Sequence, residues 1–188
     1  MNQLDQLRGD LSFIRSVASN ATSHDSPATI YFLWAFLVLC GFVLVDVRDE
    51  WVSPYWAIAA PAGFVASAYM GWRYGRGRGQ LDGRMGRRHL LHWGGTLAAV
   101  FLTSLMAATG VLAQEGVGMA MLLVLALGYF HAGVHLDRPF LWVGALMAAG
   151  YVWVTFIPAY AWTVLGVVVA VALIVAGFRE SRVHEATA

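Results

Sequence analysis

The sequence predicts an all-α polytopic membrane protein with six transmembrane helices, preceded by a short N-terminal amphipathic helix. Three observations predict this class: 59% of the residues are hydrophobic, only 12% are charged, and long apolar segments contain no Asp, Glu or Arg in their interiors. A soluble domain carries about 25% charged residues, whereas a bilayer-spanning helix needs about 20 predominantly apolar residues. Six such segments fill most of the 188 residues. We therefore expect one membrane domain and no separate soluble domain.

The chain divides into a polar N-terminal region (residues 1–27), a membrane domain (28–178) and a polar tail (179–188). Apolar runs predict the helices of the membrane domain over residues 28–45, 55–72, 91–113, 117–136, 139–156 and 160–178. Pro27 and Pro139 are typical of the first turn of a helix. The last segment is rich in valine and apolar on all sides, so we expect it to face lipid.

The N-terminal region contains an apolar stripe formed by Leu4, Leu7, Leu11 and Ile14, at spacings of three, four and three residues. This pattern predicts an amphipathic helix. Such a short helix either lies on the membrane surface, pairs in a dimer or docks to a partner protein.

Small residues recur every four positions in the second predicted span: Ala59, Gly63, Ser67, Gly71 and Gly75. Small residues at this spacing form a groove that lets another helix approach closely. The partner helix belongs either to the same chain or to a second copy.

The arginines predict the orientation. All twelve basic residues are Arg. If the chain crosses the membrane six times, both termini lie on the same side, and eleven of the arginines lie on that side too. Arg48 alone lies on the other side. Short cytoplasmic loops retain positive charge, so we expect a bacterial inner-membrane protein with both termini in the cytoplasm. Aromatic belts are then expected outside at Trp51, Tyr55, Trp56, Tyr160 and Trp162, and inside at Tyr31, Trp72, Tyr74, Trp93 and Trp142.

Residues 75–88 form the most basic segment, with five Arg and five Gly in fourteen positions. A flexible basic loop at the inner leaflet is expected to bind anionic lipid headgroups, each Arg contributing about 1 kcal/mol. The predicted lipid-binding residues are Arg76, Arg78, Arg84, Arg87 and Arg88. No aromatic residue is interleaved among them, so a nucleic-acid partner is not expected.

Four histidines form two pairs with helical spacing, His89 with His92 and His131 with His135, near the cytoplasmic end of one predicted hairpin. Histidines three or four residues apart lie on one helix face, and imidazole binds zinc, iron and copper. The pairs could form a four-nitrogen metal site, with Asp137 as an outer acceptor, or supply haem ligands such as His92 and His131. The alternative is that these histidines are interfacial residues that bind lipid phosphates or loop carbonyl groups.

The predicted membrane centre carries no ionisable side chain, which argues against a driven transporter. We favour a small accessory or scaffold subunit, not an enzyme, that contacts anionic lipid and a protein partner through its cytoplasmic face. The first alternative is a metal- or haem-dependent oxidoreductase that uses the four histidines. The second is a homo-oligomeric channel or facilitator built around the small-residue groove. The pattern identifies no catalytic residue.

Overall fold

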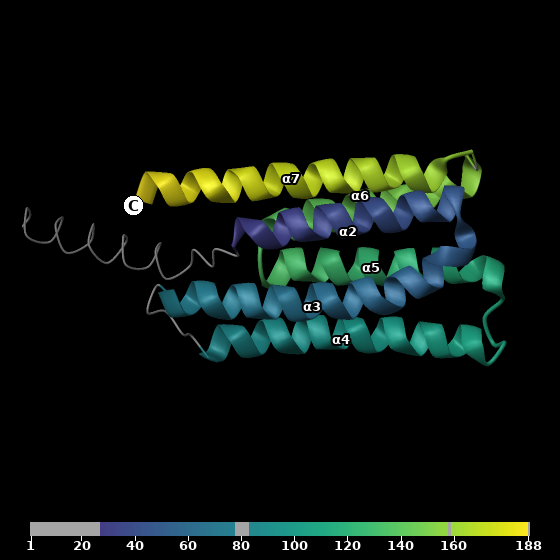
Figure 1. Cartoon of the computed structure of the whole chain (residues 1–188), viewed down its shortest axis with the longest axis horizontal. Helices are drawn as coiled ribbons and strands as arrows, with labels where there is room; N and C mark the ends of the chain where they lie inside the picture. Colours follow the sequence, from purple (N-terminus) through teal and green to yellow (C-terminus); the bar gives the residue numbers. More distant parts are fainter. Residues whose placement is uncertain (1–26, 78–82, 158, 188) are drawn as a thin grey trace, which may run out of the picture.

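The computed structural model describes residues 27–77, 83–157 and 159–187 (Figure 1). These residues form six long helices and one 3-10 turn, and no strand is found among them, which confirms the all-α prediction. The elements are α2 (Ala28–Val47), η1 (Asp49–Trp51), α3 (Val52–Gly77), α4 (Gly83–Ala108), α5 (Gln114–His135), α6 (Arg138–Phe156) and α7 (Ala161–Thr187). The predicted amphipathic helix and Arg78 lie outside the described residues.

Three helices extend well beyond their predicted bounds. α4 begins at Gly83, eight residues before its predicted start, so residues 83–88 of the expected basic loop belong to the first two turns of a helix. At its other end α4 stops at Ala108, five residues short of the predicted end. α3 ends at Gly77 and continues through Pro61, and α7 runs on into the polar tail as far as Thr187. Hydropathy did not predict these ends because it detects only the apolar part of a helix. The backbone hydrogen bonds of the helix continue into the neighbouring polar residues.

Five of the six helices, α2, α4, α5, α6 and α7, are long and apolar enough to cross a bilayer, which indicates a membrane protein. α3 is less apolar, since it carries a proline, several aromatic residues and arginines near its end. Its 26 residues nevertheless span about 39 Å at 1.5 Å per residue. α3 also runs the length of the bundle (Figure 1), packed against α2.

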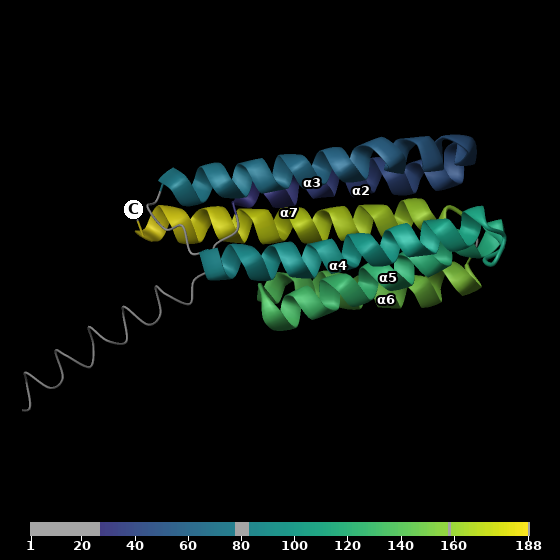
Figure 2. The ribbon, with the colours of Figure 1, turned by 90° about the horizontal axis from the view of Figure 1, so that it is seen from below.

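The helices follow one another around the bundle in the order α3, α2, α7, α6, α5, α4. α2 packs along α7, α5 packs along α6, and α6 contacts α7. Through the backbone, α3 approaches only α2 among the long helices and α4 approaches only α5, although Trp93 of α4 also reaches Phe140 of α6. No close backbone contact joins α3 to α4 within the described residues. Figure 1 shows α3 and α4 side by side, whereas Figure 2 shows them on opposite sides of α7. α3 and α4 are therefore the two ends of an open series of helices.

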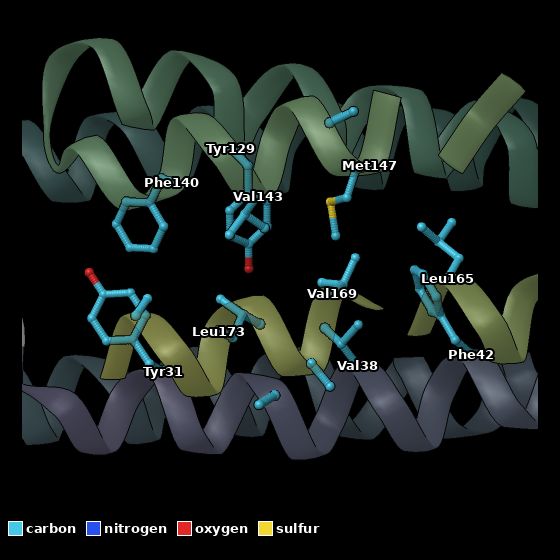
Figure 3. Packing of buried hydrophobic residues seen from close by; sticks show 14 of the residues in the cluster. Tyr31, Val38, Phe42, Tyr129, Phe140, Val143, Met147, Leu165, Val169 and Leu173 are labelled. Carbon is cyan, nitrogen blue, oxygen red and sulfur yellow. The ribbon is translucent and has the colours of Figure 1, made fainter. Parts of the chain in front are cut away.

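The most buried helix is α7, contrary to the expectation that it faces lipid. Val169 is fully buried and Leu173 is 1% exposed, whereas Val171 is 53% exposed. Figure 3 shows Val169 and Leu173 between Val38 of α2 and the side chains of the facing helices. A helix that is apolar on all sides carries no signal of which face packs, and here one face meets both α2 and α6.

Glycines set the closest helix contacts. A Cβ atom on Gly133 of α5 would collide with the backbone of Leu141 on α6, and one on Gly144 would collide with the backbone of Phe130 on α5. Gly166 of α7 similarly accommodates the ring of Phe42. These glycines do not repeat every four residues within one helix, so the spacing that singled out α3 could not find them.

At the end of the bundle opposite the start of α2 and the end of α7, the carboxylate of Asp46 tethers α2 to α7. Asp46 Oδ2 accepts a hydrogen bond of 2.7 Å from the backbone N–H of Thr163 in the first turn of α7. An acidic group at this position satisfies a free N–H and interacts favourably with the helix dipole. Asp46 thus acts as a helix cap supplied by a distant part of the chain.

Candidate functional site

The candidate site is the basic end of the bundle, which holds the first turns of α2, α4 and α6 and the last turns of α3, α5 and α7 (left in Figure 1). Every arginine in the described part of the chain except Arg48 lies at or near this end. The exposed side chains are those of Arg73, Arg76, Arg87, Arg88, Arg138, Arg179 and Arg182. The basic end therefore presents positive charge on several helices at once.

Four of these arginines have no acidic partner among the described residues. None of Arg73, Arg76, Arg87 and Arg88 forms an ion pair with a described residue. The one ion pair found within the described ranges joins Arg48 to Glu50 at 3.5 Å, at the opposite end of the bundle. No acidic side chain of the described residues therefore neutralises these four arginines at the ends of α3 and α4.

An exposed aromatic pair accompanies the arginines of α3. The guanidinium of Arg76 lies 5.3 Å from the ring centre of Trp72, a cation–π contact. The ring of Tyr69 lies 6.1 Å from that of Trp72, and both side chains are about half exposed. Amphipathic rings beside a cation are typical of the boundary between a membrane and water.

His92 joins two helices. Its Nε2 lies 3.0 Å from the carbonyl oxygen of Gly128 on α5, so this nitrogen is the donor. Thr96, one turn further along α4, packs against Gly128. His92 therefore helps to hold α4 against α5.

His131 and His135 lie on an exposed face of α5. Their rings are nearly parallel, at 9°, with centres 6.2 Å apart. His89 is half-buried on α4, and Asp137 is the N-cap residue of α6. Within the described residues, no three His, Cys, Asp or Glu side chains come close enough together to hold a metal ion. The structure brings His131 and His135 together but does not gather all four imidazoles into one group.

Aromatic residues pack inside the basic end. Trp93 contacts Tyr129 and Phe140 with ring centres 5.3 and 5.7 Å apart, and Tyr31 stacks on Phe140 at 5.4 Å. This cluster joins α2, α4, α5 and α6. Tyr31 is 2% exposed, so the expected belt position of Tyr31 is wrong: its ring packs on α6 and does not face lipid.

The small residues of α3 pack against α2 over part of their length. Ala59 is buried, Gly63 lies against Leu37 and Trp34, and Ser67 Oγ accepts a hydrogen bond of 3.0 Å from Trp34 Nε1. Gly71 has no neighbouring side chain within 4 Å, and Gly75 lies in the last turn of α3. The partner of the groove between Ala59 and Ser67 is therefore a helix of the same chain.

Comparisons with known proteins identify no relative. No family model matches the chain, and neither a curated protein nor a solved structure is similar to it.

Proposed function

We propose that this protein is a small accessory or scaffold subunit of a bacterial inner membrane that contacts anionic lipid and a protein partner at its basic end. Both termini would lie in the cytoplasm. The observation that supports the proposal is that Arg73, Arg76, Arg87 and Arg88 are exposed, have no ion-pair partner among the described residues, and lie at the ends of α3 and α4, where Tyr69 and Trp72 are half exposed.

The chemistry of these residues fits a lipid surface. Arginine donates bidentate hydrogen bonds to phosphate, and basic residues next to a membrane helix are attracted to the anionic inner leaflet. The protein partner would be bound by residues 1–18, because this segment precedes α2 and the first turn of α2 lies at the basic end (Figure 1).

Cross-linking in membranes tests the partner contact. The tagged full-length chain should form a cross-linked complex of defined stoichiometry, which is lost when residues 1–18 are deleted and reduced by Arg87→Gln with Arg88→Gln. Arg48→Gln is a matched control, because it removes an arginine from the opposite end. A complex that these changes leave intact, or that Arg48→Gln weakens equally, would contradict the proposal, as would the absence of any complex.

A second candidate function, binding of a transition metal, is favoured by the parallel rings of His131 and His135. An i, i+4 histidine pair on one helix face can supply two imidazole ligands, and a partner or substrate would complete the site. Elemental and visible-absorption analysis of the purified chain tests this function. Near-stoichiometric zinc, iron or copper, or a haem band, should disappear in a His131→Ala, His135→Ala variant and remain after His184→Ala. Metal content that is absent or unaffected by the first variant would exclude the pair as a metal site.

A further inference from the structure

We infer that the basic ends of α3 and α4 together bind one phospholipid that carries two phosphate groups, as cardiolipin does. The inference builds on the lipid contact of the proposed function and adds the class of lipid and the residues that select it.

The arginines form two pairs on two helices. Arg73 and Arg76 are one turn apart near the end of α3, and Arg87 and Arg88 are adjacent in the first two turns of α4. The five residues 78–82 connect the helices, so Gly77 and Gly83 lie at most about 22 Å apart. In the inferred site, each arginine pair receives one of the two phosphates of the lipid.

The surfaces next to the arginines are apolar and uncovered. Leu90 and Leu91 of α4 are 62% and 64% exposed. On α3, the exposed apolar side chains next to the arginines are Tyr69 and Trp72. Only 6% of the apolar part of α4 is buried, against 28% for α2, α5 and α6. These surfaces would take acyl chains while the arginines hold the headgroup.

The opposite ends of α3 and α4 lack this combination. Arg48, beside the start of α3, is paired with Glu50, and the last turns of α4 contain no arginine. On α3 and α4, arginines that can bind phosphate therefore lie next to exposed apolar side chains at the basic end and not at the opposite end.

Two phosphates in one molecule are favoured over two separate lipids. Once the first phosphate is bound, the second binds intramolecularly at a high effective concentration. Lipids with one phosphate gain no such advantage. We expect a preference for cardiolipin over phosphatidylglycerol at equal phosphate concentration.

The test uses the delipidated full-length chain in detergent, titrated with cardiolipin or with phosphatidylglycerol, and counts the retained lipid by native mass spectrometry. Wild-type protein should retain cardiolipin about tenfold more tightly per phosphate. Either Arg73→Gln with Arg76→Gln, or Arg87→Gln with Arg88→Gln, should reduce this preference to near unity. Arg179→Gln with Arg182→Gln is the matched control, since it removes the same charge from α7 at the same end of the bundle.

The outcomes separate this inference from the proposed function. Equal retention of the two lipids by wild-type protein would overturn the two-phosphate site and leave general anionic-lipid binding intact. An equal effect of the α7 control would show a diffuse electrostatic attraction and would also overturn the site. Retention of neither lipid would remove the lipid contact itself. If a glutamine variant fails to fold, Arg87→Lys with Arg88→Lys keeps the charge but loses bidentate geometry, and an undiminished preference there would contradict the site.

Discussion

Gly144 is one of the two glycines at which the backbones of α5 and α6 approach each other closely. A Cβ atom there would collide with the backbone of Phe130, which cannot rotate aside as a side chain can. We expect Gly144→Ala to push the two helices apart and to lower the free energy of unfolding by about 1–3 kcal/mol. Thermal unfolding in detergent, followed by the reaction of the half-buried Cys40 with a thiol-specific dye, measures the change.

Gly94→Ala is the control for this substitution. Nothing lies within 4 Å of a Cβ atom placed on Gly94, and alanine is the better helix former. Gly94→Ala should leave the temperature of the unfolding transition unchanged or raise it slightly. Equal transition temperatures for Gly144→Ala and Gly94→Ala would show that the close contact of α5 and α6 is not present.

Asp46 connects two helices through one hydrogen bond. Replacing it with alanine should leave the N–H of Thr163 without its carboxylate acceptor and destabilise the protein by about 1 kcal/mol. Asp49→Ala removes an equal charge from the exposed first position of η1 and should change stability by less than about 0.5 kcal/mol. The same dye-based thermal assay distinguishes the two, and equal losses would contradict the capping role of Asp46.

At the scale of elements, the structure divides the small-residue groove of α3 into a packed part and an open part. Gly63→Leu should collide with Leu37 and Trp34 and separate α3 from α2, at a cost of about 1–3 kcal/mol. Gly71→Leu should be tolerated, because Gly71 faces open space. The thermal stability and the assembly state of both variants are measured in detergent. A large loss of stability in Gly71→Leu would instead indicate that a second copy of the chain packs against Gly71.

Hydropathy and spacing predicted which segments are helices but not how the helices pack. The six apolar runs were recognisable because a bilayer helix must satisfy its backbone internally and bury a long apolar surface. The burial of Val169 and Leu173 was not predictable, since the same residue types also face outward on α7. Packing of a uniformly apolar helix depends on shape, which a hydrophobic pattern does not encode.

At the scale of the whole molecule, the candidate site was only partly predictable. The arginines were visible as a basic segment, but their division between two helices required the observed start of α4 at Gly83. The spacing of the histidines predicted that the two members of each pair share one helix face. It could not predict how far the pair on α4 lies from the pair on α5. His92 illustrates this difference, because its ring binds the carbonyl group of Gly128 on α5.

The proposed topology depends on α3, which among the described long helices is the one that falls outside the five long and apolar enough to cross a bilayer. If α3 crosses the bilayer, reporter fusions after Gly77 and after Ala188 should both be cytoplasmic, and a fusion after Ala113 should be periplasmic. If α3 stays on the outer side, the fusion after Gly77 becomes periplasmic, and the arginines of α3 and α4 no longer share one face with the positive charge expected in the cytoplasm. Paired phosphatase and fluorescent-protein reporters at these three positions distinguish the arrangements, because each reporter is active on only one side of the membrane. We expect the six-helix crossing, since α3 is long enough to span and packs against α2 through Gly63 and Ser67.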